Sequence, residues 1–207
     1  QILSEAQTDN VAVLLRMADV AYMMENYTAM SEVCDKALHL DTSNLQTYLY
    51  YAKACRGLGE PIRAVAVLSL AIKLREDYYA ARLLRGTILL ENHLLDDAAQ
   101  DADYLFTHLE PNEDVLLLKA RVLKAQEKMK EAEQVYGMVI EVNPFSLDAY
   151  RERSEVRTIL GDAAGAAEDE ASIKEMGAEV PEPSEGIEQK IKEKMQQMDP
   201  YKVFHNE

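Results

Sequence analysis

Residues 116–144 read LLLKARVLKAQEKMKEAEQVYGMVIEVNP, and this stretch decides the fold. Apolar residues recur three and four positions apart on both sides of Glu127-Lys128, which is the spacing of amphipathic helices. The stretch closes with Asn143-Pro144, and proline ends a helix because it has no backbone N–H to donate. The stretch therefore predicts two helices joined by a short turn.

The same pattern recurs every 34 residues along the chain. Three ladders of residues keep one phase over five steps, which a generic helical bundle would not require. The ladders are Ala18, Ala52, Gly86, Ala120 and Ser154; Met30, Ala64, Ala98, Ala132 and Ala166; and Ala37, Ala71, Leu105, Val139 and Ile173. Helices that cross at about 8–10 Å need small side chains where they touch. The first two ladders therefore predict a close crossing within each helix pair.

The order of residue types in the quoted stretch resembles the tetratricopeptide repeat. The positions that carry the resemblance are Leu116, Ala120, Leu123, Ala132, Tyr136, Val139 and Pro144. The period of 34 residues, with two antiparallel helices per repeat, is that of the same family. The resemblance covers about residues 11–177, although Trp is absent and Cys34, Ala102 and Glu170 stand where an aromatic residue is usual. It implies an all-α fold, a right-handed superhelical solenoid of antiparallel helix pairs, in the style of bacterial repeat proteins.

The 34-residue phase predicts an array of five repeat units within residues 1–177. The units run over residues 11–44, 45–78, 79–112, 113–146 and 147–177. Prolines 181 and 183 predict a linker over residues 178–184.

An apolar stripe follows the predicted linker. Its members are Ile187, Ile191, Met195 and Met198. The stripe predicts a capping helix over residues 185–198, because a solenoid must cover its last apolar face; an interaction helix for another protein is the alternative. In the tail, residues 199–207, Tyr201 and Phe204 predict docking against an apolar surface.

Composition narrows the class of protein. A net charge of −15 makes nucleic acid a poor partner, because phosphate backbones repel an acidic surface. No apolar run approaches the roughly 20 residues that a membrane span needs, so membrane insertion is not expected. Cys34 and Cys55 are too few for a disulfide framework and are expected to be buried thiols. A cytoplasmic location is slightly favoured, and an exported form with a removed signal stays open.

Motifs for catalysis are missing from the sequence. There is no Gly-rich phosphate loop, nucleophile elbow or metal motif, so we expect no enzyme activity, no cofactor and no metal site. An acidic group on one predicted helix is expected to be a solvated face, because divalent sites need a shaped loop with more ligands. Its members are Asp96, Asp97, Asp101 and Asp103.

The candidate site follows from the architecture that the resemblance implies, in which the first helix of each unit lines the concave face. On the predicted first helices, the residues just off the ladder that begins at Ala18 form a row of leucines. This row is either core between units or an exposed apolar patch. The second and fourth units contribute cations to the same predicted groove. The predicted groove residues are Leu15, Tyr22, Leu49, Lys53, Arg56, Leu83, Leu90, Leu117, Arg121 and Lys124.

One known groove chemistry of the family is disfavoured. The carboxylate clamp, which holds the acidic C-terminus of a chaperone, needs Lys and Asn in one unit, Asn in the next, and Lys with Arg in the third. In the frame that begins with the second unit, those places hold Leu49 and Lys53, then Leu84, then Asp114 and Leu118. The other frames fail in the same way.

The sequence therefore predicts a noncatalytic scaffold that binds an extended or helical segment of a partner protein in its concave groove. Leucines would supply affinity, and Lys53, Arg56, Arg121 and Lys124 would select acidic groups. The alternative is a substrate-recognition fragment of a larger enzyme, such as a protein glycosyltransferase. The identity of the partner and the oligomeric state stay open.

Overall fold

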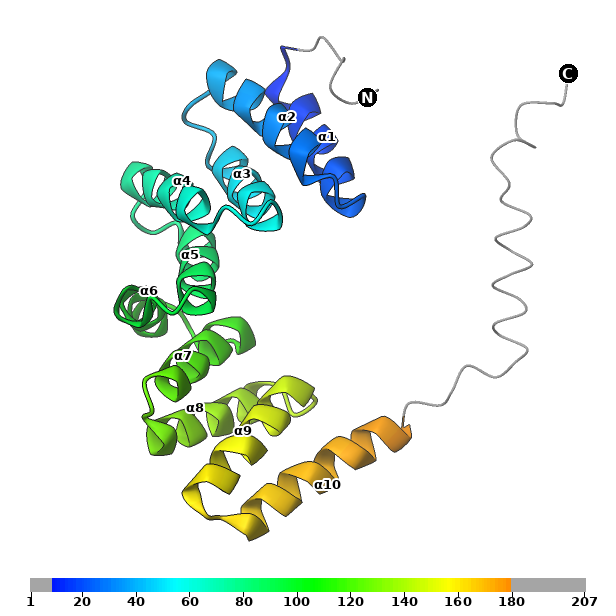
Figure 1. Cartoon of the computed structure of the whole chain (residues 1–207), viewed down its shortest axis with the longest axis vertical. Helices are drawn as coiled ribbons and strands as arrows, with labels where there is room; N and C mark the ends of the chain where they lie inside the picture. Colours follow the sequence, from blue (N-terminus) through cyan, green and yellow to red (C-terminus); the bar gives the residue numbers. More distant parts are fainter. Residues whose placement is uncertain (1–8, 180–207) are drawn as a thin grey trace, which may run out of the picture.

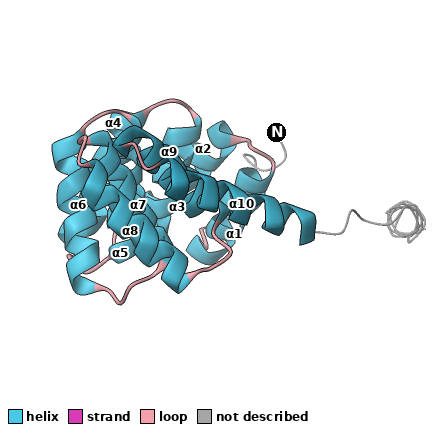
Figure 2. Ribbon diagram, turned by 90° about the horizontal axis from the view of Figure 1, so that it is seen from below, coloured by secondary structure: helices cyan, strands magenta, loops and turns pink. Residues whose placement is uncertain are grey.

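The structure, a computed structural model, describes residues 9–179 of the 207-residue chain (Figure 1). This part is all-α, as predicted, and it contains no strand. Its helices are α1 Val11–Met23, α2 Tyr27–Leu40, α3 Leu45–Gly57, α4 Pro61–Leu74, α5 Tyr79–Glu91, α6 Leu95–His108, α7 Glu113–Ala125, α8 Met129–Val142, α9 Leu147–Leu160 and α10 Ala163–Glu179. Figure 2 shows that short loops join them.

The spacing of the helices follows the 34-residue period. The first helices of the pairs begin at residues 11, 45, 79, 113 and 147, and the second helices at residues 27, 61, 95, 129 and 163. One expected boundary differs, because α10 continues through Glu179, so residues 178 and 179 are helical and not linker. The expected capping helix over residues 185–198, and the tail with Tyr201 and Phe204, lie outside the described residues.

The pairs stack into an arc whose inner side is formed by the first helices (Figure 1). Each helix packs on the next one along the chain. In addition α1 contacts α3, α3 contacts α5, and α5 contacts α7, whereas successive second helices in residues 9–179 make no comparable contact. The first helices from α1 to α7 therefore lie closer together, on the shorter, concave side, whereas α7 and α9 make no comparable contact.

The turn inside each pair has one backbone conformation. The residue at positive φ recurs every 34 positions, at Glu25, Gly59, His93, Glu127 and Gly161. The next residue donates its backbone N–H to the carbonyl five positions back, as Glu60 does to Cys55 at 2.8 Å. This bond is the helix ending that a left-handed residue permits, and its repetition aims every second helix in the same direction.

Small residues mark the helix crossings, as the ladders predicted. Ala18, Ala52 and Ala120 are fully buried. At Gly86 an added Cβ would lie 2.9 Å from a methyl carbon of Leu118 and 3.2 Å from Cβ of Asp101. Close packing from α6 and α7 therefore explains why a glycine is tolerated inside α5.

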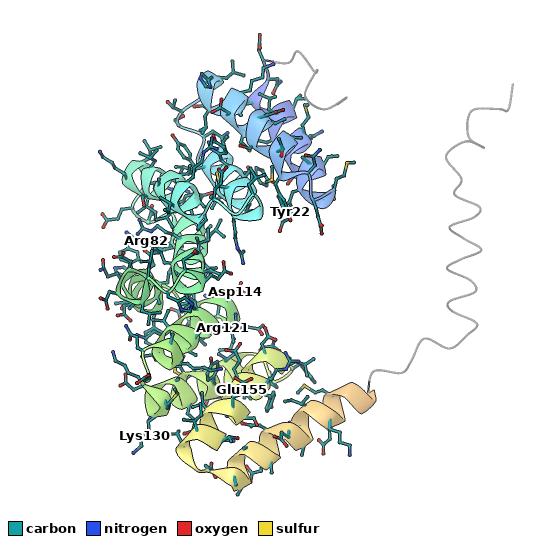
Figure 3. All side chains as sticks on the ribbon, in the orientation of Figure 1. Tyr22, Arg82, Asp114, Arg121, Lys130 and Glu155 are labelled. Carbon is teal, nitrogen blue, oxygen red and sulfur yellow. The ribbon has the colours of Figure 1, made fainter. Side chains whose placement is uncertain are left out.

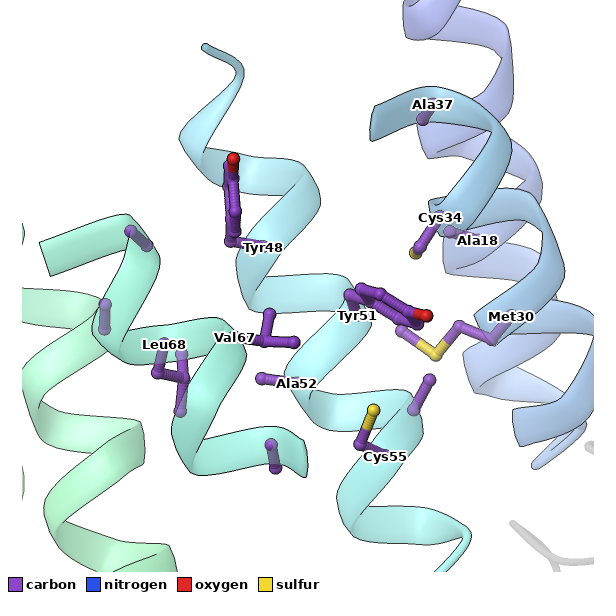
Figure 4. Close-up of a cluster of buried hydrophobic side chains, with 14 of the residues drawn as sticks. Ala18, Met30, Cys34, Ala37, Tyr48, Tyr51, Ala52, Cys55, Val67 and Leu68 are labelled. Atoms are coloured by element: carbon purple, nitrogen blue, oxygen red, sulfur yellow. The ribbon is translucent and has the colours of Figure 1, made fainter. Parts of the chain in front are cut away.

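The interior of the first two units is apolar (Figure 4). Side chains from α1 to α4 meet there, and Cys34 and Cys55 are buried free thiols among them, as expected. Burial raises the pKa of Cys34 to about 12. Neither thiol is therefore ionised at neutral pH.

Two carboxylates are buried inside later hairpins, and one of them corrects an expectation. Asp101 was expected on a solvated face, but it is fully buried. It accepts two hydrogen bonds from Arg85, both at 2.7 Å, and one from Arg82 at 3.3 Å. Asp169 repeats the arrangement with Arg153, at 2.6 and 3.0 Å. Both carboxylates are tolerated because an arginine fork neutralises them.

Candidate functional site

All ten predicted groove residues lie on first helices, from α1 to α7. Figure 3 shows labelled side chains of this face, among them Tyr22, Arg121 and Glu155, on the inner side of the arc, whereas Lys130 lies on the outer side. The structure thus brings the predicted residues to one face. It gives them different surroundings along that face.

The leucine row is partly core and partly accessible, so neither of the two alternatives left open by the sequence holds for the whole row. Leu117 is 8% exposed and belongs to the core of the last two units. Leu49, Leu83 and Leu90 are half-buried and pack against the core. Leu15 is also half-buried. The row therefore offers an apolar floor rather than a fully exposed patch.

A recess of about 140 Å³ opens in the middle of this floor, between α5 and α7. Its lining combines three leucines with polar and charged residues at the rim: Leu83, Thr87, Asp114, Leu117, Leu118 and Arg121. An apolar recess rimmed by polar groups is the usual form of a site that takes a side chain or small ligand.

At the α7–α9 end, the predicted cations are paired with carboxylates of the next unit. Arg121 donates from Nε to Glu152 at 2.8 Å and from Nη2 to Asp148 at 3.0 Å. Lys124 donates to Glu155 at 2.6 Å. The charge of both cations is therefore already offset within the chain.

Glu152 also ties the groove to the core. It accepts a hydrogen bond of 2.6 Å from the hydroxyl of Tyr136, which is fully buried. Burial, and then the neighbouring Glu152 carboxylate, raises the pKa of Tyr136 far above its ordinary value. The hydroxyl therefore remains a donor at any physiological pH and fixes the position of Glu152.

At the α1–α3 end, the cations differ from each other. Arg56 donates from Nε to Glu91 at 3.0 Å. Lys53 instead lies over aromatic rings, with Nζ 5.2 Å from the centroid of Tyr22 and 5.9 Å from that of Tyr50. Within residues 9–179, no carboxylate lies within 4.0 Å of this ammonium group. A cation held on tyrosine faces keeps its charge available.

A second tyrosine of this end was missed by the sequence argument. Burial, followed by a hydrogen bond to Asp19, raises the pKa of Tyr50, and Gln46 donates to its hydroxyl at 3.3 Å. The carboxylates of α9 were missed as well. A signal for them exists, because Glu152 and Glu155 each follow a groove cation by 31 residues, which places them opposite it on the neighbouring first helix.

Among residues 9–179, no cluster of three or more His, Cys, Asp or Glu side chains could hold a metal ion. None of the helices in this part is both long enough and apolar enough to cross a membrane.

Comparison with protein-family models and with curated protein sequences gives no match. Solved structures do match. MamA, residues 41 to the end, from Desulfovibrio magneticus RS-1 superposes with a TM-score of 0.77 at 14% identity, covering 86% of this chain and 100% of that one. YrrB, described as a TPR protein with an unusual peptide-binding site, superposes with a TM-score of 0.65 at 15% identity, covering 90% and 94%.

A third similar structure is a tetratricopeptide repeat protein from Parabacteroides merdae ATCC 43184, with a TM-score of 0.69 at 21% identity, covering 79% of this chain and 64% of that one. These likenesses, together with the paired helices, define the fold. Residues 9–179 have the tetratricopeptide-repeat fold, a solenoid of five helix pairs.

Proposed function

We propose that the chain is a noncatalytic scaffold whose concave groove binds a segment of a partner protein. The observation that carries the proposal is the recess between α5 and α7, where Leu83, Leu117 and Leu118 form an apolar floor on the concave side. An apolar side chain of a bound segment would anchor there, and buried anchors of this kind carry most of the affinity in protein interfaces.

The groove cations take a different part in this proposal from the one that the sequence suggested. Arg56, Arg121 and Lys124 hold neighbouring units together through Glu91, Glu152 and Glu155. An acidic partner would have to displace these carboxylates to reach them. We therefore infer that the recess supplies the binding affinity and that mainly Lys53 selects acidic groups.

The alternative of a substrate-recognition fragment of a larger enzyme gains no support from residues 9–179. No arrangement of side chains in this part of the chain indicates that it belongs to an enzyme rather than to another kind of protein. The scaffold proposal needs only the groove.

The test uses a display library of random 16-residue peptides, selected on the intact chain. Thr87 is half-buried at the recess and Arg121 occupies the equivalent place one unit later, so Thr87→Arg should fold while obstructing the recess. We expect the enriched peptides to bind Thr87→Arg at least tenfold more weakly than the unaltered chain. Lys130→Glu on the outer side of the arc is the matched control and should leave binding unchanged.

Circular dichroism would confirm that both variants keep their helices. If no peptide is enriched, or if enriched peptides bind Thr87→Arg as well as the unaltered chain, the groove is not the binding surface.

A further inference from the structure

The concave face differs in charge between its two ends. Near α1 and α3 it carries two cations and two carboxylates: Lys53, Arg56, Asp19 and Glu91. Near α7 and α9 it carries three cations and four carboxylates: Arg121, Lys124, Arg151, Asp114, Asp148, Glu152 and Glu155. Formal charge alone therefore differs between the two ends.

Ion pairs within the chain increase the difference in available charge between the two ends. At the α7–α9 end both predicted groove cations are bonded to carboxylates, and Arg151 lies 3.5 Å from Asp148. The side chains of Asp148 and Glu155 nevertheless remain 54% and 55% exposed. A carboxylate has room for about four hydrogen bonds, so these two can accept further donors while the cations are already engaged. This end presents acceptors to a ligand.

At the α1–α3 end the available cation is Lys53, and the Asp19 carboxylate nearby is engaged by the hydroxyl of Tyr50. Lys53 lies against the rings of Tyr22 and Tyr50 and has no carboxylate partner in residues 9–179. Tyr22 is 44% exposed, so the cluster opens onto the groove. A carboxylate that approached Lys53 would gain a charge-assisted hydrogen bond without displacing an internal one.

Between the two ends lies the apolar recess of α5 and α7. The third unit contributes no charge to the recess, since its lining residues there are Leu83 and Thr87. The concave face therefore runs from a cationic, aromatic end through an apolar middle to an end of exposed carboxylates.

We propose that the groove binds a segment of a partner protein, and that the charge of this segment changes along its length. Acidic residues of the segment lie over Lys53, an apolar side chain enters the recess, and basic residues lie over Asp148 and Glu155. This inference rests on the proposed groove function and adds the order of charges. A segment with acidic residues along its whole length would meet repulsion at α9.

The experiment extends the peptide selection to charge-reversed chains. The same 16-residue library is selected on the intact chain, on Lys53→Glu and on Glu155→Lys. We expect the pool from the intact chain to hold acidic residues in one half and basic residues in the other. The pool from Lys53→Glu should lose the acidic half, and the pool from Glu155→Lys should lose the basic half.

A charge exchange then measures the contact directly. The best peptide from the intact chain should bind about tenfold more weakly to Lys53→Glu, and a peptide in which its acidic residues become lysines should recover that loss. Lys130→Glu, on the outer side, is the control and should change neither value. Raised salt should weaken binding to the intact chain, because these contacts are exposed.

Two failures can be told apart. Enriched peptides that depend on Thr87 but show no separation of charge, or that bind Lys53→Glu undiminished, overturn the charge order and leave the groove function standing. A library that yields no enriched peptide on any version overturns the groove function, and the charge order with it.

Discussion

Residues 11–78 and residues 79–179 follow the same 34-residue plan, but the two regions hold their helices together with different chemistry. In the first region the buried side chains are apolar apart from Thr47, and they include the thiols Cys34 and Cys55. In the second region two fully buried carboxylates, Asp101 and Asp169, bind arginines within their own hairpins. Each region keeps the same helix positions.

The comparison is clearest at one repeat position. Asp101 and Asp169 stand where the first, second and fourth units have Val33, Val67 and Val135, all buried. Both carboxylates follow their arginine partner by 16 residues, as Asp101 follows Arg85. The repeat thus determines that the position is buried, whereas its chemistry depends on the residue that faces it from the other helix of the pair.

The largest expected effect comes from removing one of the buried carboxylates. Asp101→Ala leaves Arg85 and Arg82 without their shared partner inside the third unit. Because breaking a buried ion pair from one side leaves an uncompensated charge, we expect the free energy of unfolding to fall by about 3–5 kcal/mol. Urea unfolding followed by circular dichroism would measure it.

A triple exchange serves as the control for that prediction. Arg82→Leu, Arg85→Lys and Asp101→Val together copy the residues that the fourth unit has at these positions. Arg82→Leu and Asp101→Val replace buried charges by apolar side chains, which is often neutral or stabilising, and the equivalent Lys119 of the fourth unit pairs with an exposed carboxylate, Asp103. We therefore expect most of the loss to be recovered. A triple variant as unstable as Asp101→Ala would show that the two units differ by more than these side chains.

Much of the fold could be predicted from the sequence, because repeat phase controls backbone and burial together. The ladder of Ala18, Ala52 and Ala120 located the crossings, and the turn predicted at Glu127-Lys128 contains the positive-φ residue Glu127. The period carries this information because each unit packs against its neighbours through the same positions.

The chemistry of the groove could not be predicted in the same way. Arg121 and Lys124 looked like free cations, yet both are bonded to carboxylates one unit later. Asp101 looked like a surface acid, yet its partner lies on the preceding helix. Whether a charge is available depends on its neighbour on the facing helix, and a composition count does not contain that neighbour.

The second prediction concerns the link between groove and core in the second region. Glu152→Ala removes the acceptor of the buried Tyr136 hydroxyl and one partner of Arg121. A buried donor without a partner costs about 1–3 kcal/mol, and we expect a loss of about 2–3 kcal/mol in unfolding free energy. Glu155→Ala, which removes an exposed bond to Lys124, should cost less than about 1 kcal/mol. Equal losses would contradict the assigned role of Tyr136.

The third prediction uses pH to probe the first region. Burial, followed by the nearby Cys55, raises the pKa of Cys34 from 9.0 to about 12. Above about pH 9 the unfolded chain releases this proton while the folded chain retains it, so stability is complete below pH 9 and declines as pH rises towards 12. The decline from this thiol is at most about 1.4 kcal/mol per pH unit.

Alanine at the same position separates the thiol from other titrating groups. Cys34→Ala copies Ala102, the buried residue at the equivalent place in the third unit, and should show a shallower decline between pH 9 and 11. The measurement is urea unfolding at a series of pH values. An unchanged slope in the variant would assign the decline to other groups, such as Cys55, whose pKa is also raised by burial, and the tyrosines.

The smallest expected effect is a gain in stability within the first region. The hydroxyl of Thr47 is buried and has no hydrogen-bond partner among the described residues. The equivalent place in the fourth unit is Val115, also buried. Thr47→Val keeps the branched shape and removes a polar group that loses its hydration on folding, so we expect a gain of about 1 kcal/mol in unfolding free energy.

The matched Val115→Thr exchange should lose a similar amount, which would show that both regions bury this position alike. A loss of stability in Thr47→Val would contradict the assignment of this hydroxyl as an unsatisfied buried group, and the contrast between the two interiors would then be smaller than the described contacts indicate.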